Sequence, residues 1–207
     1  MKAYIYTGGS IYPQNITEHP KGKCVTIAAD SGYSNAKLLG ETVDILLGDL
    51  DSLGEKNIPK SVEVLKVPAE KDFTDTQLAV QYATDKGANE IYIIGGLDGR
   101  LDHTMSNIAI LRDLADKNIH AVITDGNNRI RYVRATSTLL AKSQFKYVSL
   151  LADGEKVKGV SVEGCKYPLK RATLRRERQF AVSNELTGNV AFVSVRRGGV
   201  FIIESSD

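Results

Sequence analysis

Leu46-Leu47-Gly48-Asp49-Leu50-Asp51-Ser52 is the stretch of the sequence that best indicates the fold. It ends an apolar run, 43–47, with a glycine and two carboxylates. Residues two apart in an extended chain point to the same side, so we expect Asp49 and Asp51 to project together from the end of a strand. Neighbouring carboxylates repel and usually share a cation, and oxygen ligands without His or Cys suit Mg²⁺ better than Zn²⁺. An aspartate-rich turn is the alternative for the motif taken alone.

Strand and helix patterns alternate through the first 125 residues. Val, Ile and Tyr are concentrated in short runs that predict strands at 2–7, 24–29, 43–47, 61–67, 90–94 and 120–124. Patterns with helical spacing and cap signals predict helices at 31–39, 74–86 and 104–116. This alternation is typical of an α/β fold with a parallel, doubly wound sheet.

The pattern changes after Asp125-Gly126-Asn127-Asn128. Short strands without a credible helix are predicted at 129–133, 137–140, 147–151, 157–162, 179–182, 189–195 and 200–204, and Arg196-Arg197-Gly198-Gly199 predicts a tight hairpin turn. This favours an antiparallel β-sandwich or barrel. We therefore predict an α/β domain with a parallel doubly wound sheet over residues 1–130, followed by an all-β sandwich domain over residues 131–207.

Charge differs strongly between the two halves of this 207-residue chain, whose net charge is only +2. Residues 1–125 carry 12 Lys and Arg against 18 Asp and Glu, whereas the remainder carries 15 against 7. The basic half would suit phosphates, nucleic acid or an acidic partner, or it is simply a solvated surface. No run approaches the roughly 20 apolar residues of a membrane span, and no secretory signal is visible, so we expect a cytoplasmic protein without a membrane.

Acidic and glycine residues follow several of the predicted strands. They occur in Asp30-Ser31-Gly32, in the double-aspartate stretch and in Gly95-Gly96-Leu97-Asp98-Gly99-Arg100-Leu101-Asp102-His103, while Lys71-Asp72-Phe73-Thr74-Asp75 opens a helix. Ligands of an open α/β sheet bind beyond the carboxyl ends of its strands, so we expect these groups to converge. Singly, each has a structural explanation, namely a helix cap, a charge complementing a helix dipole, a tight turn or a surface ion pair.

Several nucleotide and catalytic motifs are absent from the sequence. It contains no Walker A loop, no G-x-G-x-x-G after the first strand and no G-x-S-x-G elbow. A phosphate site would then depend on Mg²⁺ held by carboxylates and on Arg or Lys.

These motifs, in this order and over nearly the whole chain, resemble the thiamine pyrophosphokinase family. The resemblance extends to Asp30-Ser31-Gly32-Tyr33-Ser34-Asn35 and, in the second half, to Lys166-Tyr167-Pro168-Leu169 and Ser183-Asn184-Glu185. It implies an α/β domain followed by a β-sandwich, and transfer of the pyrophosphoryl group of ATP to the hydroxyl of thiamine, with Mg²⁺ as cofactor and AMP released. It also implies a homodimer with active sites at the subunit interface.

The resemblance also implies roles for individual residues. Asp49, Asp51 and Asp75 would form the metal site, with Asp30 and Asp72 close by; Lys71 and Arg100 would contact ATP phosphates, and Asp102 would face thiamine. Ser31, Asn35 and Thr74 belong to the nucleotide-binding motifs, and Ser183 and Asn184 would line the thiamine pocket. The chain contains no Trp, so any ring stacking on thiamine would fall to a Tyr or Phe.

Three other functions remain open from the sequence. A related pyrophosphokinase acting on another ring alcohol, such as a hydroxymethylpterin, would carry the same carboxylates. A metal-dependent phosphohydrolase would also use them. A non-catalytic nucleotide- or RNA-binding module would use the basic half, but few aromatic residues lie among Arg171, Arg175, Arg176 and Arg178, so nucleic acid is an unlikely partner.

Overall fold

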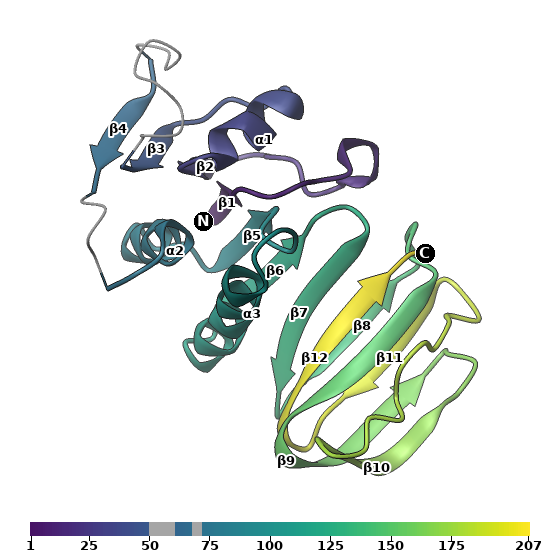
Figure 1. Ribbon diagram of the computed structural model, residues 1–207. Coiled ribbons are helices and arrows are strands. Elements are labelled where there is room, and N and C mark those ends of the chain that lie inside the picture. Colours follow the sequence, from purple (N-terminus) through teal and green to yellow (C-terminus); the bar gives the residue numbers. More distant parts are fainter. Residues whose placement is uncertain (50–60, 68–71) are drawn as a thin grey trace. The chain divides into compact units, whose positions relative to one another are not determined.

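A computed structural model describes residues 1–49, 61–67 and 72–207 of the chain. It divides into two compact units, residues 1–126 and 127–207. The protein is a mixed α/β structure in which most elements are strands (Figure 1). No helix among the described residues is long and apolar enough to cross a membrane.

The first unit is built on a parallel sheet. Its strands are β1 (Lys2–Tyr6), β2 (Cys24–Ala29), β3 (Ile45–Gly48), β4 (Glu63–Lys66), β5 (Glu90–Ile94) and β6 (His120–Thr124), in the order β4-β3-β2-β1-β5-β6. All neighbouring pairs are parallel, as predicted, and each predicted strand of this half is present. The chain first runs outward from β1 to β4 and then returns to continue from β5, so the strand order reverses between β1 and β5.

Among the described residues, three helices and one short turn of 3-10 helix accompany this sheet. They are η1 (Pro13–Asn15), α1 (Gly32–Leu38), α2 (Asp75–Asp85) and α3 (Leu101–Asp116). Figure 1 shows α1 on one face of the sheet and α2 and α3 on the other. Helix α3 begins three residues before its predicted start of 104. Buried residues such as Tyr6, Leu46 and Ile94 fill the core beneath α1, because alternate strand positions point to the same face.

The second unit is made of strands. They are β7 (Asn128–Arg134), β8 (Ser137–Ala141), β9 (Tyr147–Glu163), β10 (Leu169–Arg175), β11 (Val190–Ser194) and β12 (Arg197–Ser205), in the order β7-β12-β9-β11-β8 with β10 also pairing with β9. The pairs are antiparallel. One apolar cluster takes side chains from all six strands, for example Leu150 of β9, Leu174 of β10 and Val193 of β11.

Some sequence predictions for this unit are wrong. The predicted strands 147–151 and 157–162 are one 17-residue strand, β9, which continues through Gly154 and Gly159, both at positive φ. Residues 179–182 form no strand. Strand β10 was not predicted, because bulges against β9 break the alternation and charged residues dominate it. Residues 196–199 make no hairpin: β11 pairs with β8 and β9, whereas β12 pairs with β7 and β9.

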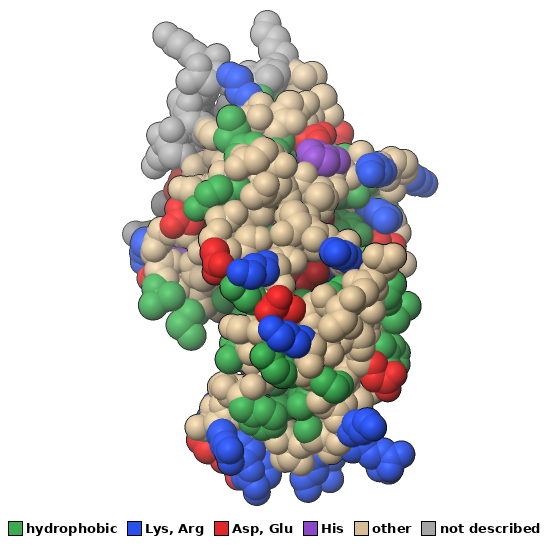
Figure 2. Space-filling model, turned by 90° about the vertical axis from the view of Figure 1, so that its right-hand side faces the viewer, with side chains coloured by type: hydrophobic (Ala, Val, Ile, Leu, Met, Phe, Trp, Pro, Cys, Tyr) green, Lys and Arg blue, Asp and Glu red, His purple; other side chains and the backbone are tan. Residues whose placement is uncertain are grey.

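A buried ion-pair cluster connects β7 to β12 in the second unit. Glu204 is only 2% exposed and accepts hydrogen bonds from Arg129 at 2.9 and 2.7 Å and from Arg131 at 2.7 Å. The guanidinium of Arg129 also lies 4.9 Å from the ring centre of Phe145. Outside such pairs the unit carries many exposed cations, and Figure 2 shows Lys and Arg gathered at the lower end of its visible face.

We predict that Glu204→Gln lowers the free energy of unfolding by about 3 kcal/mol, because it removes the buried negative charge that the largely buried guanidinium groups of Arg129 and Arg131 both contact. Urea denaturation followed by circular dichroism measures the effect. Glu163→Gln makes the same change at an exposed position of β9, and its free energy of unfolding should stay within about 0.5 kcal/mol of that of the unchanged protein. Equal stability of the two variants would contradict the role assigned to Glu204.

Candidate active site

A cavity of about 350 Å³ opens at the carboxyl edge of the parallel sheet, where the strand order reverses. Its walls come from the ends of β1, β2 and β5 and from the first turns of α2 and α3. The lining residues are Thr7, Gly8, Gly9, Ala29, Asp30, Ser31, Thr74, Asp75, Thr76, Gly96, Asp98, Gly99, Arg100, His103 and Asn107. Open α/β sheets bind their ligands at such a point, because the loops on either side diverge there.

The floor of the cavity is the loop Thr7-Gly8-Gly9, which follows β1 directly. Buried Asn35 of α1 donates from Nδ2 to the carbonyl oxygens of Thr7 at 2.8 Å and Gly9 at 2.9 Å. The Thr76 hydroxyl of α2 adds a hydrogen bond of 3.2 Å to the Thr7 hydroxyl. Asn35 is not among the residues that line the cavity. Its amide holds the loop in position from behind.

Asp30 stands at the sharp turn from β2 into α1. Its φ of 45° lies in the left-handed region, which few residues other than glycine and asparagine adopt without cost. The backbone N–H of Asp30 donates to the carbonyl of Leu47 at 2.8 Å. A Cβ on Gly48 would lie 3.2 Å from the Cα of Asp30, so the start of the double-aspartate stretch runs close beside Asp30. Ser31, which follows, also lines the cavity.

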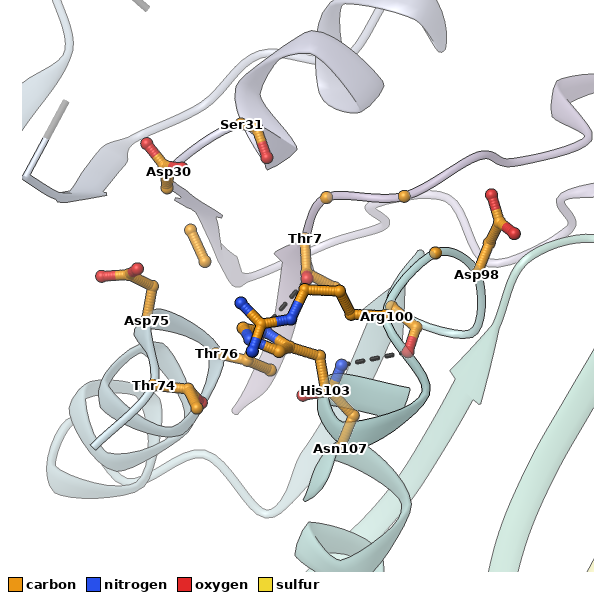
Figure 3. A pocket seen from close by; sticks show the side chains of 15 residues that line it. Thr7, Asp30, Ser31, Thr74, Asp75, Thr76, Asp98, Arg100, His103 and Asn107 are labelled. Carbon is orange, nitrogen blue, oxygen red and sulfur yellow. Dashed lines mark hydrogen bonds between the residues drawn. The ribbon is translucent and has the colours of Figure 1, made fainter. Parts of the chain in front are cut away.

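Asp75 is the first residue of α2. Thr74 before it forms a capping box, accepting from the N–H of Gln77 at 3.2 Å while its own N–H donates to the Gln77 side chain at 2.9 Å. The cap fixes the start of the helix, so the Asp75 carboxylate stands at the cavity. Figure 3 shows Asp30 and Asp75 on one side of the view and Asp98 on the other, with Arg100 between them. Asp72 is exposed and is not among the lining residues.

The loop between β5 and α3 forms the opposite wall. Asn107 of α3 is buried and donates to the carbonyl of Gly96 at 3.0 Å. Gly96 has a φ of 74°, and a Cβ there would lie 2.6 Å from Asn107 Nδ2, so this turn requires glycine. Asp98 accepts from the backbone N–H of Ser10 at 3.2 Å, and hydrogen bonds led by the Ser10 side chain lower the pKa of its carboxyl.

Arg100 and Asp102 form a two-pronged ion pair at the rim of the cavity. Arg100 donates from Nε to Oδ1 at 3.1 Å and from Nη2 to Oδ2 at 2.6 Å. The hydrogen bond from Arg100 is the main reason that the pKa of Asp102 is lowered to about 2, and the N–H of His103 adds to it. Arg100 lines the cavity and Asp102 does not, so Asp102 holds the guanidinium in place and its charged form is a weak base.

The side chains at this edge that could hold a cation are carboxylates, which chemically suit Mg²⁺. Asp30 and Asp75 line one cavity, and Asp49 directly follows Gly48, which packs against Asp30. These are carboxylate oxygens, the ligands that Mg²⁺ prefers. Asp51 and Lys71 lie outside the described residues, and no group of three possible ligands forms among the residues that are described.

The two predicted thiamine-binding residues belong to the second unit. Asn184 is buried, and its side chain exchanges hydrogen bonds with the backbone of Tyr167, accepting from the N–H at 2.9 Å and donating to the carbonyl at 2.8 Å. It therefore holds the segment around Tyr167. Ser183 is exposed, has a φ of 56° and donates from its N–H to the Ser149 hydroxyl at 3.0 Å.

Five predicted residues thus line one cavity, namely Asp30, Ser31, Thr74, Asp75 and Arg100. Sequence reasoning missed Thr7 and Asn107, and it gave no individual role to Asp98 and His103. Two signals were available: Gly8-Gly9 directly follows the first strand, and Asp98 and His103 lie within the glycine-rich stretch after β5. No local pattern marked Asn107, because its role depends on a hydrogen bond across the loop.

Comparison with known protein families gives two matches in sequence order. Residues 18–123 match the thiamin pyrophosphokinase catalytic domain, and residues 136–200 match the thiamin pyrophosphokinase vitamin B1 binding domain. The chain belongs to the thiamine pyrophosphokinase family. The thiamine pyrophosphokinase of Bacillus subtilis (strain 168) is 32% identical over 165 residues, which are 77% of each chain.

A more distant relative and a solved structure carry the same family name. Thiamin pyrophosphokinase 1 of Caenorhabditis elegans is 26% identical over 200 residues, 92% of this chain and 82% of that protein. The crystal structure of thiamine pyrophosphokinase from Bacillus subtilis superposes with a TM-score of 0.90 at 26% identity, covering both chains completely.

We predict that Arg100→Gln raises the pKa of Asp102 from about 2 toward 3.8, its ordinary value. Because the pKa of Asp102 is lowered, the ion pair is fully formed at pH values above the ordinary pKa of 3.8, and it is lost as the pH falls through about 2. Carboxyl-carbon NMR titration of Asp102 measures the change. Arg112→Gln, which breaks a pair with Asp113 on the same helix, is the control and should leave Asp102 unchanged. A pKa near 2 in Arg100→Gln would show that the backbone of His103, not Arg100, is responsible.

Proposed function

We propose that the chain is a thiamine diphosphokinase, which transfers the pyrophosphoryl group of ATP to the hydroxyl of thiamine and gives thiamine diphosphate and AMP. The observation that carries this proposal is the cavity at the strand-order reversal. Carboxylates and one arginine line it, and it lies in the part of the chain that matches the catalytic family model. The second family model supports thiamine as the acceptor in preference to a pterin alcohol.

ATP binds with its phosphates in this cavity. The N–H groups of Arg100 that Asp102 leaves free, together with Lys71, neutralise phosphate oxygens. The first turns of α2 and α3 border the same space, and the N–H groups of a helix start favour anions. Asp30, Ser31 and Thr74 complete the walls around the nucleotide, and Asn35 fixes the loop beneath it.

Asp49, Asp51 and Asp75 would hold Mg²⁺, with Asp30 and Asp72 nearby. The metal, when bound, supplies positive charge to the phosphate oxygens. This explains why the chain keeps several carboxylates beside a site for an anionic substrate: without a cation they would repel ATP. Oxygen donors alone make up the set, which suits this metal.

The transfer forms a bond between the hydroxyl oxygen of thiamine and the β-phosphorus of ATP. The bond from that phosphorus to the oxygen bridging to the α-phosphate breaks, and AMP leaves. Such transfers depend on positioning and charge neutralisation more than on covalent help from the protein. Arg100 therefore acts on the developing charge, and Asp102 keeps its guanidinium in one orientation.

Residues 1–130 then form the catalytic domain, and residues 131–207 form a β-sandwich domain that binds thiamine through Ser183 and Asn184. We further propose a cytoplasmic homodimer, in which the catalytic domain of one subunit and the sandwich of its partner build each active site. The opposite charges of the two halves support this arrangement, because the acidic half of one chain attracts the basic half of another.

We predict that the protein converts ATP and thiamine, with Mg²⁺, into equal amounts of AMP and thiamine diphosphate. Asp75→Asn should lower the rate at least about 10²-fold, because it removes a carboxylate from the charge balance of the transfer. Asp85→Asn, at the far end of the same helix, should leave the rate unchanged. Chromatographic product analysis measures both.

Each alternative function gives a different product pattern. ADP with thiamine monophosphate would overturn pyrophosphoryl transfer. Turnover with a hydroxymethylpterin but not thiamine would identify the other acceptor. Phosphate release without any acceptor would identify a hydrolase, and RNA binding without turnover would identify a binding module.

The same assay tests the shared active site. Asp75→Asn and Ser183→Glu should each be inactive alone, because one removes a carboxylate of the metal site and the other places a charge in the thiamine pocket. An equal mixture after subunit exchange should recover about a quarter of the activity, since half of the dimers are mixed and each has one intact site. No recovery would place the whole site within one chain.

A further inference from the structure

A second, basic groove lies on the β-rich unit, and every described residue that lines it belongs to that unit. It is open and has a volume of about 720 Å³. Its cations are Lys158 of β9, Arg171 of β10 and Arg196 and Arg197 at the start of β12. Figure 2 shows Lys and Arg gathered at the height at which Figure 1 draws β9 and β10.

The shape of the groove follows from two irregularities in the pairing of β9 with β10. Ala172 of β10 pairs with Val160 of β9, and the next residue of β10, Thr173, pairs with Lys158 of β9. Gly159 therefore has no partner on β10 and forms a bulge, with a φ of 69°. The bulge lets Lys158 and Ser161, three residues apart, both lie on the outer face, whereas Val157, Val160 and Val162 are buried.

The cations crowd around this bulge. A Cβ on Gly159 would lie 2.6 Å from the Cβ of Arg196, so the glycine makes room for that arginine over the strand. On β10, Arg171 takes a φ of 47°, and its N–H donates to the Ser161 hydroxyl at 3.1 Å. The hydroxyl groups of Thr173 and Ser194 also line the groove.

The charges in the groove are uncompensated. None of the residues described along it is acidic, and none of the four cations pairs with a carboxylate in the described part of the chain. Lys158 and Arg197 are direct cross-strand partners in the register of β9 and β12. Like charges opposite each other destabilise a sheet, so this arrangement costs free energy unless an anion lies between them.

We propose that this groove binds an oligophosphate anion, either free or as the phosphate chain of a nucleotide. Arginine and hydroxyl donors match phosphate oxygens, and four cations suit more than a single phosphate. None of the described residues along the groove is aromatic, so they offer no stacking surface for a base or another ring. The site is separate from the cavity in the first unit, and the proposal stands whether or not the chain phosphorylates thiamine.

Binding of inorganic tripolyphosphate to the full-length protein, measured by calorimetry in EDTA, tests the proposal. Arg100→Gln serves as the background, because it weakens phosphate binding in the first-unit cavity. In this background tripolyphosphate should bind, and Lys158→Gln/Arg197→Gln should weaken binding about tenfold or more, which is at least about 1.4 kcal/mol. Arg176→Gln/Arg178→Gln removes the same charge outside the groove and should change the affinity less than about twofold.

Thermal unfolding provides a second measurement that does not depend on binding. Without anion, Lys158→Gln/Arg197→Gln should melt above the unchanged protein, because the cross-strand repulsion is removed. Addition of tripolyphosphate should raise the melting temperature of the unchanged protein more than that of the variant.

Four outcomes would overturn the proposal. One is equal affinity in the groove variant and the unchanged protein, and a second is an equal loss in the control variant. A third is the absence of any binding in the Arg100→Gln background, which would assign the anion to the first-unit cavity. The fourth is a single-stranded RNA that displaces tripolyphosphate at far lower concentration, which would identify a nucleic-acid surface. An ATP affinity that Lys158→Gln/Arg197→Gln lowers as strongly as it lowers the tripolyphosphate affinity would support recognition of the phosphate chain of a nucleotide. An ATP affinity that the groove variant leaves unchanged would contradict binding of a nucleotide in the groove.

Discussion

The Asn35 amide, which holds the carbonyls of Thr7 and Gly9, is the interaction on which the first-unit site depends. These carbonyls lie where β1 ends and the strand order reverses. Gly95 packs against the same loop, since a Cβ on it would lie 2.6 Å from the Thr7 oxygen. A buried carbonyl without a donor is costly, so the Asn35 amide, together with the Thr76 hydroxyl and the Gly96 N–H, fixes the path of the loop and with it the floor of the cavity. The carboxylates and Arg100 are then arranged around a fixed surface.

Sequence patterns predicted the first unit well because most of its strands are buried apolar runs and its helices show apolar residues at helical spacing. β3, for example, is apolar throughout and ends at a glycine, and α2 begins with a capping box that the sequence displays as Thr74 and Gln77. The second unit was harder. The polar, mostly exposed stretch Asp153-Gly154-Glu155-Lys156 makes β9 look like two strands, and the bulges against β9 break the alternation of β10. The local sequence also does not show which strands pair with each other across a sheet. For this reason the predicted hairpin at residues 196–199 is wrong.

The candidate site shows the same division. Residues that line the cavity because they follow a strand or begin a helix, such as Asp30 and Asp75, could be predicted from the order of the elements alone. For residues that form hydrogen bonds to distant backbone segments, the sequence indicated that they matter but gave no sign of the segments they hold. Asn35 and Asn184 were both expected to contact substrate, and in the structure the amides of both hold backbone segments, Asn184 through Tyr167. Whether they also touch a ligand stays a prediction.

The most direct test of the account is the affinity of ATP for Asn35→Ala, measured by calorimetry with Mg²⁺. The account predicts a protein that stays folded by circular dichroism and binds ATP about tenfold more weakly, because the Thr7 and Gly9 carbonyls lose their shared donor and the loop no longer has one path. Asn189→Ala, an exposed change in the second unit, should bind ATP as the unchanged protein does. A folded Asn35→Ala protein with unchanged ATP affinity would contradict the claim that this loop is the floor of the nucleotide site.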